Sequence, residues 1–148
     1  MKVKYVSTVD WRWNQDILRA NPLFHGQERY DYALIKVGTE DSNEAIFVQI
    51  LHIFCLNFRL TQTPLALVLP FDGSCRPIDR RRDDRLRLTR VQARPRSSAV
   101  VISTLSIIRG GLLAKDPSSP NSMFVVEFVD EDMWTRMKKT KLVENARL

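Results

Sequence analysis

Three observations predict a mainly-β fold that ends in one α-helix. Apolar residues alternate at period two through much of residues 30–129, and Gly, Pro, Asn and Ser clusters separate the runs. The runs are rich in β-branched and aromatic residues, which favour strands. Capping signals with helical spacing follow residue 129. We expect a small β-barrel or roll of about five to seven strands with a C-terminal helix.

The length and composition indicate a single folded unit. A chain of 148 residues that is 44% apolar is expected to bury one core. We expect one β-rich domain over residues 27–143. An N-terminal extension or short helix over residues 1–26 precedes it, and a tail over residues 144–148 follows it.

The N-terminal segment carries the signals of a short helix. Asp10 is expected to cap this helix, which would extend to Ala20 and end before Pro22. Trp13 and Ile17 then share one of its faces.

The longest apolar stretch, residues 44–56, predicts the central strand. Its β-branched and aromatic side chains occupy both faces, as in a strand covered on two sides. Pro64 and Pro70 are expected to bracket a later strand. The strands expected around the central one cover residues 30–37, 63–69, 86–91, 99–102, 105–108 and 123–129.

The C-terminal helix is predicted from its charges. Asp130 is expected to cap it, with acidic residues at its positive end and basic residues toward its negative end. Met133, Trp134 and Met137 form its apolar stripe at helical spacing.

An arginine-rich block at residues 76–96 carries the charge of the chain. It holds nine arginines, three aspartates and no lysine, and its net charge of +6 equals that of the whole chain. Guanidinium suits bidentate contacts with phosphate or carboxylate. Residues 79–84 are expected to form a charge-mixed loop. In the strand that follows, Leu86 and Leu88 are expected to face inward while Arg85 and Arg87 face outward.

The block leads to two functional hypotheses. In the first, its arginines bind the phosphate backbone of duplex DNA or chromatin; the candidate residues are Arg80, Arg81, Arg82, Arg85, Arg87, Arg94 and Arg96. No aromatic residue falls between Arg76 and Arg96, which disfavours base stacking. In the second, Asp79, Asp83 and Asp84 pair with the arginines, and the chain is a protein-interaction or scaffold domain without nucleic-acid binding. An acidic protein surface is the other possible partner of an exposed arginine block.

No pattern in the chain predicts catalysis, a metal site or a cofactor. His25, His52, Cys55 and Cys75 lack the paired spacing of a zinc clip. His52 is expected to be a core or edge histidine in its strand, and Cys55 to act as a small hydrophobe. The sequence Arg109-Gly110-Gly111 lacks the further residues of a phosphate-binding loop and is expected to form a bend between strands. We therefore expect a binding module and not an enzyme, with no small-molecule substrate.

Several successive stretches of the sequence resemble a known family. The successive runs HGQERYDYALIKV, EAIFVQILHIFCL, TPLALVLPFD, DDRLRLTRVQARPRSS, SIIRGGLLAKD and FVVEFVDEDMWTRMKK span roughly residues 25–139. They resemble the C-terminal segment of proteins encoded by basidiomycete mobile elements of the Plavaka or Kyakuja–Dileera–Zisupton type. Their layout is similar to bromo-adjacent-homology (BAH) modules, which are β-rich domains that bind chromatin or other proteins. The resemblance implies an accessory domain derived from such an element.

The sequence also bears on where the protein acts. Two cysteines are too few for a disulfide framework, which favours a reducing compartment. The N-terminal residues lack the apolar core of a signal peptide, and no apolar run is long enough to cross a bilayer. We expect no membrane association and an intracellular location, nuclear in preference to cytoplasmic.

Overall fold

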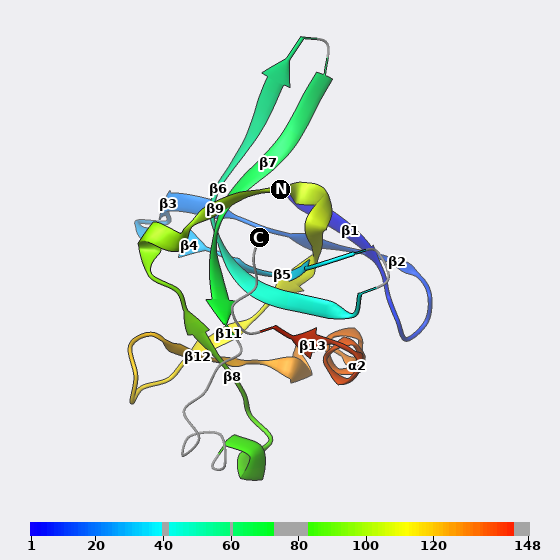
Figure 1. Cartoon of the computed structure of the whole chain (residues 1–148), viewed down its shortest axis with the longest axis vertical. Coiled ribbons are helices and arrows are strands. Elements are labelled where there is room, and N and C mark those ends of the chain that lie inside the picture. Colours follow the sequence, from blue (N-terminus) through cyan, green and yellow to red (C-terminus); the bar gives the residue numbers. More distant parts are fainter. Residues whose placement is uncertain (40–41, 60, 73–82, 144–148) are drawn as a thin grey trace.

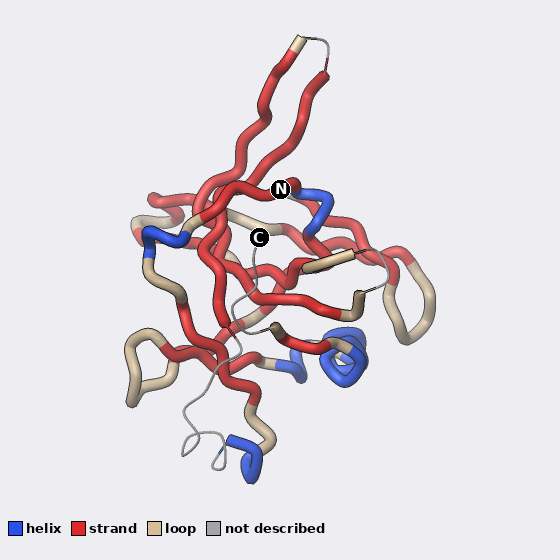
Figure 2. The backbone as a smooth tube through the Cα atoms, viewed as in Figure 1, coloured by secondary structure: helices blue, strands red, loops and turns tan. Residues whose placement is uncertain are grey.

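A sheet of nine strands forms most of the computed structural model, which describes residues 1–39, 42–59, 61–72 and 83–143 (Figure 1). Seven strands follow one another in the order β10-β5-β6-β7-β8-β12-β11. Strand β9 also pairs with β7, and β13 pairs with β6. Figure 2 shows how far strands predominate over helices. The predicted mainly-β class is confirmed.

Strand β6 (Glu44–Phe58) is central, as its two-sided apolar pattern predicts. It pairs with β5 (Tyr32–Lys36) on one side and with β7 (Thr61–Asp72) on the other. β7 is longer than expected, because Pro64 and Pro70 lie within the strand and do not bracket it. The ladder between β6 and β7 shifts register between Ile50 and His52.

Two hydrophobic clusters cover the two faces of β5 and β6. Ala33, Ile35, Ile46 and Val48 belong to one cluster, and Leu34 and Phe47 to the other. The alternation expected for residues 30–37 is thereby confirmed over residues 33–35, and the strand begins at Tyr32 and not at residue 30. The register shift after Ile50 moves Ile53 onto the same face as Ile50, where it packs against the first cluster.

The N-terminal segment forms strands, so the helix expected from Asp10 to Ala20 is wrong. β1 (Lys2–Val6) pairs with β2 (Trp13–Ile17), and β3 (Ala20–Phe24) pairs with β4 (Gln27–Tyr30). Asp10 caps a turn instead, since its carboxylate accepts from the Arg12 amide at 3.2 Å. Val3 and Leu18 are buried in the first core cluster, which anchors the β1–β2 hairpin to the sheet.

The strand expected at residues 86–91 begins later than predicted. Residues 83–86 form a helical turn, and β8 covers Thr89–Ala93. Leu86 and Leu88 are 58% and 37% exposed, so they do not face inward. After β8 come η1 (Arg96–Ser98), β9 (Val100–Ser103), η2 (Thr104–Ser106) and β10 (Ile107–Gly111).

The glycine pair ends β10, directly before the chain leaves its pairing with β5, which fits the expected place between two strands. A Cβ atom on Gly111 would lie 2.7 Å from Cε1 of Phe47. Gly111 is therefore also required by the close approach of a buried aromatic ring.

The C-terminal part is close to the prediction. β11 (Leu113–Lys115) and β12 (Ser122–Val125) precede η3 (Glu127–Val129), so the strand expected to reach residue 129 stops at Val125. The predicted cap of α2 (Glu131–Lys139) is confirmed, because Asp130 accepts from the Met133 amide at 2.7 Å. β13 (Lys141–Leu142) then pairs with the start of β6. Of the helices in the described ranges, none combines the length and apolar character needed to cross a bilayer.

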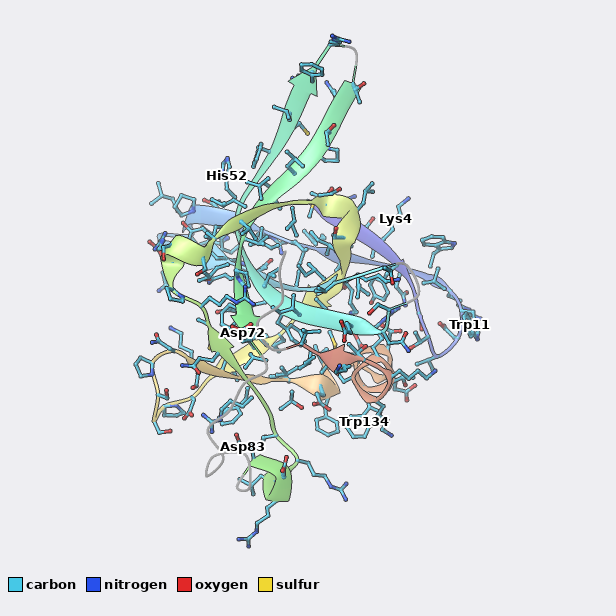
Figure 3. The ribbon with its side chains drawn as sticks, in the orientation of Figure 1. Lys4, Trp11, His52, Asp72, Asp83 and Trp134 are labelled. Carbon is cyan, nitrogen blue, oxygen red and sulfur yellow. The ribbon has the colours of Figure 1, made fainter. Side chains whose placement is uncertain are left out.

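The paired ends of β6 and β7 extend beyond the rest of the molecule as a two-stranded arm (Figure 1). The turn that contains Asp83 lies at the opposite end of the long axis of the molecule (Figure 3).

Candidate nucleic-acid interface

The structure separates the candidate arginines into three groups. Arg80, Arg81 and Arg82 lie outside the described residues. Arg85, Arg87 and Arg96 are exposed and form no ion pair with another described residue. Arg94 is paired. Arg90, which belongs to the block but was not a candidate, is buried.

Arg90 is held between two aspartates beneath the turn. Its Nε donates to Oδ2 of Asp83 at 2.6 Å, and its Nη2 donates to Oδ1 at 3.1 Å. It also forms an ion pair with Asp116, and its guanidinium lies 4.4 Å from the centre of the Phe124 ring. The three ionic side chains are at most 8% exposed. The hydrogen bond that Arg90 donates to Asp83 raises the pKa of Arg90 further above its ordinary value.

This arrangement explains why the turn adopts its local conformation. The amide of Leu88 donates to the Asp83 carbonyl at 2.9 Å, which closes the helical turn. Arg87 then takes a positive φ of 52°, and the chain enters β8. With the Asp83 carboxylate directed inward, Arg85 and Arg87 remain on the solvent side.

Arg94 closes the other end of β8 against β7. Its Nε and Nη2 donate to the two carboxylate oxygens of Asp72 at 2.9 and 2.6 Å. These bonds raise the pKa of Arg94 above its ordinary value. Both side chains are less than one-fifth exposed. The guanidinium of Arg94 is therefore already paired with a carboxylate of its own chain.

The exposed arginines do not share one face. Arg85 and Arg87 precede β8, and Arg96 follows it in η1. Five strand residues span roughly 17 Å. The exposed candidates among the described residues are thus one pair, Arg85 and Arg87, and one distant residue, Arg96.

A second buried arginine, Arg109 of β10, was missed from the sequence. Its Nη1 donates to Asp130 at 2.9 Å and to Asp132 at 2.7 Å, and its Nη2 donates to Asp130 at 2.6 Å. Its guanidinium lies 4.6 Å from the centre of the Tyr5 ring, and its Nε lies 3.5 Å from Asp16. Nε is also the one buried side-chain polar atom of the described residues without a hydrogen-bond partner.

Asp132 extends this network to both ends of the chain. It accepts from the amide and the hydroxyl of Thr8 at 2.6 and 2.9 Å, and from Nε of Arg136 at 2.7 Å. Burial alone would raise the pKa of Asp132, but the bonds from Arg136, Thr8 and Arg109 outweigh it and lower that pKa to about 2. The network joins the β1–β2 hairpin, β10 and α2. Its only signal in the sequence is an arginine inside an apolar strand.

A pocket of about 350 Å³ lies beside Arg109. Asp16, Tyr30, Asp31 and Tyr32 contribute to its lining, together with the half-exposed side chains of Ile17, Leu112 and Val129. Asp31 accepts from Nε of Arg29 at 3.0 Å. A volume of this size, with apolar and polar walls, is typical of ligand or peptide side-chain sites.

The histidines and the described cysteine lie apart from this region. His25 is in the turn between β3 and β4 and contacts Phe24 edge-on. His52 is exposed on β6 and stacks on Phe54, so it is not a core histidine. Cys55 is exposed because β6 extends beyond the body of the molecule, which corrects the expectation of a buried thiol. Cys75 is outside the described residues, and the described part of the chain holds no group of three or more His, Cys, Asp or Glu arranged for a metal ion.

Comparison of the chain with protein-family models, with curated proteins and with solved structures found no match. The geometry of these arginines and of the pocket is therefore the basis for a functional proposal.

Proposed function

We propose that the protein is a non-catalytic module that binds the phosphate backbone of duplex DNA through the turn carrying Arg85 and Arg87. The observation behind this proposal is the inward direction of Asp83. In the sequence, Asp83 stands beside Arg82 and Arg85 and would offset their charge. In the structure its carboxylate is 4% exposed and pairs with Arg90, which lies beneath the turn.

The charge of the turn supports this proposal. The pairing with Arg90 leaves Asp84 as the exposed acid beside Arg85 and Arg87. Three further arginines, residues 80–82, directly precede the turn in the sequence. Guanidinium groups that contact the phosphates release counterions from DNA on binding, so the affinity falls with added salt and is largely indifferent to sequence.

A salt titration with matched charge variants tests the proposal. Binding of a labelled duplex is measured by fluorescence anisotropy at several salt concentrations, for the wild type and for Arg85→Ala/Arg87→Ala. We expect weaker binding at every salt concentration and a slope of log K against log salt that is smaller by roughly 0.9 for each lost contact.

The control variant is Arg12→Ala/Arg59→Ala, which removes the same charge from two exposed arginines of other turns. It is expected to keep the wild-type slope. Equal losses of DNA affinity in the two double variants would show that the net charge of the protein, and not this turn, governs binding. Absence of any binding at low salt would contradict the proposal itself. Arg96→Ala then tests whether the far end of β8 joins the same contact.

A second candidate function, a protein-interaction domain, is favoured by the pocket beside Arg109. Two arginines of the block are paired internally: Arg90 with Asp83, one of the three aspartates of that hypothesis, and Arg94 with Asp72. The pocket has half-exposed apolar side chains at Ile17 and Leu112, which suit a polypeptide side chain. This function is supported over the first if the protein does not bind DNA and if Asp16→Asn weakens its binding to a protein partner.

We further propose a nuclear location and association with chromatin, which go with DNA binding. We also propose that the domain originated as an accessory domain of a mobile element. The location is tested by imaging a fluorescent fusion of the full chain. Under this proposal the Arg85→Ala/Arg87→Ala variant loses retention on chromatin, while the Arg12→Ala/Arg59→Ala variant keeps it.

A further inference from the structure

The register of β6, β7 and β9 defines two faces on the arm that carry different chemistry. Residues directly opposite each other in an antiparallel ladder lie on the same face of the sheet. Phe54 is opposite Leu65, Leu56 is opposite Thr63, and Leu67 is opposite Val101. The apolar residues of the outer arm face are therefore Phe54, Leu56, Phe58, Leu65, Leu67 and Val101; His52, opposite Leu67, and two threonines share the face.

The other face of the same ribbon is polar toward its tip. There Cys55 is opposite Pro64 and Asn57 is opposite Gln62, and all four residues are exposed. Closer to the body, this second face carries Ala66 and packs into the first core cluster. The arm is thus amphipathic, and its apolar side is directed away from the core of its own chain.

The outer arm face packs against neither core cluster and is most exposed toward its tip. None of its six apolar residues belongs to either core cluster. Leu56, Phe58 and Val101 are 53%, 65% and 53% exposed. A two-stranded ribbon without packing is marginally stable in water, and a contiguous exposed apolar patch usually marks an interaction site.

We infer that this outer arm face binds the same face of a second copy of the chain. The strands of this face carry no Asp, Glu, Lys or Arg, although the chain has a net charge of +6. A cation lies at its tip, where the Arg59 guanidinium is 5.3 Å from the centre of the Phe58 ring. An acidic partner would find complementary charge at the tip but not along the strands. A second copy meets equally uncharged strands, and the cationic turn with Asp83 lies at the far end of the molecule, away from the contact (Figure 3).

The shape of the face is also self-complementary. Near the tip, β6 presents the large side chains of Leu56 and Phe58, while β7 presents the smaller Thr63 and Thr61 opposite them. A two-fold axis would set the large row of one copy against the small row of the other, which is the condition for an isologous contact. The two ribbons would then pack as facing sheets, about 10 Å apart.

The extent of the face sets the expected strength of the dimer. Residues 52–58 of β6 give the outer arm face a length of roughly 23 Å, and its two to three strands give it a width of about 10 to 14 Å. This footprint is well below the about 800 Å² per partner of a standard stable interface. The dimer is therefore weak, in about the micromolar range or above, and it depends on protein concentration.

The test compares Leu56→Glu with Asn57→Glu. The two positions are adjacent on the same exposed strand but lie on opposite faces, so the variants share their charge and their location. The mass of the full chain is measured by sedimentation equilibrium from about 10 µM to 1 mM, the range expected for a weak contact, with reductant present to prevent disulfides through Cys55.

We expect the wild type and Asn57→Glu to form dimers as concentration rises, and Leu56→Glu to dissociate at least about tenfold more readily because like charges meet at the contact. Mixing Leu56→Glu with Leu56→Lys is expected to restore a dimer of mixed composition. A wild type that stays monomeric at 1 mM would overturn the inference. Equal behaviour of Leu56→Glu and Asn57→Glu would also overturn it, since pairing through strand edges does not distinguish the two faces. Circular dichroism of each variant establishes that it is folded.

Discussion

Arg109 donates from Nη1 to Oδ2 of Asp132 at 2.7 Å, and the two side chains are only 4% and 6% exposed. This pair links β10 to the first turn of α2. Because Asp132 also accepts from Thr8, one carboxylate connects three segments that are far apart in sequence. The pair thus holds these three segments together in the folded protein.

Replacing Arg109 with Met is expected to destabilise the protein strongly. The change removes the cation and leaves the buried Asp132 and the partly exposed Asp130 without it, which costs about 3–5 kcal/mol. The measurement is the free energy of unfolding in urea. Lys141→Met is the control: Lys141 pairs with Glu44 at 3.0 Å, and the two side chains are 76% and 37% exposed. Its loss is expected to cost less than about 1 kcal/mol. A small effect of Arg109→Met would contradict the buried pair.

The stability of the protein is expected to fall in acid. Asp132 has a folded-state pKa of about 2, and hydrogen bonds from Arg109 also lower the pKa of Asp130. The unfolded chain therefore binds more protons than the folded one at pH 3, so this stability is complete above pH of about 5 and is lost toward pH 2.

Asp132→Asn identifies the source of that acid sensitivity. The asparagine keeps the shape of the side chain but does not titrate. We expect a flatter dependence of the unfolding free energy on pH below about 5 than in the wild type. An unchanged slope would assign the acid sensitivity to other carboxylates, such as Asp116, whose pKa is also lowered to about 2 by bonds from Ser118 and Arg90.

Gly111→Ala is expected to disturb the second core cluster. The new Cβ would lie 2.7 Å from Cε1 of Phe47, which is fully buried and cannot move freely. Overpacking of this kind costs about 1–3 kcal/mol. In a double-mutant cycle, Phe47→Leu is expected to relieve part of the cost of Gly111→Ala, so the two effects are not additive. Additive losses would show that the ring and the glycine are not coupled.

Arg90→Met and Arg94→Met are expected to differ in cost. Arg90 lies between two aspartates that are 4% and 5% exposed, whereas Arg94 pairs with one aspartate that is 17% exposed. Replacing Arg90, the more buried cation, is expected to lower the free energy of unfolding by more, about 3–5 kcal/mol. Loss of the partly exposed pair costs about 1–3 kcal/mol. Thermal unfolding of the two variants measures the order, and the reverse order would contradict the burial of Arg90.

The central strand was predictable because its signal is local and strong. Residues 44–56 are apolar on both faces, and no other element of the chain competes for that pattern. The cap at Asp130 was predictable for the same reason, since its partner is three residues away. Local signals of this kind do not depend on the rest of the fold.

The arginine network was not predictable because its partners are distant. Arg109 follows two isoleucines and precedes two glycines, and the aspartates that hold it are at positions 16, 130 and 132. Asp83 likewise stands among arginines in the sequence but pairs with Arg90, seven residues on, because β8 directs Arg90 inward. The expected helix after Asp10 failed because Asp10 supports a turn locally.

The contact between Thr8 and Asp132 has a consequence for synthesis on the ribosome. These residues are 124 positions apart, so the hydrogen bonds between the β1–β2 hairpin and α2 form only after residue 132 has been synthesised. Until then Arg109 is a cation without Asp130 and Asp132. A pause between the synthesis of β10 and that of α2 would therefore leave the hairpin without its link to the helix, at a stage when a nascent chain is exposed to chaperones and to aggregation.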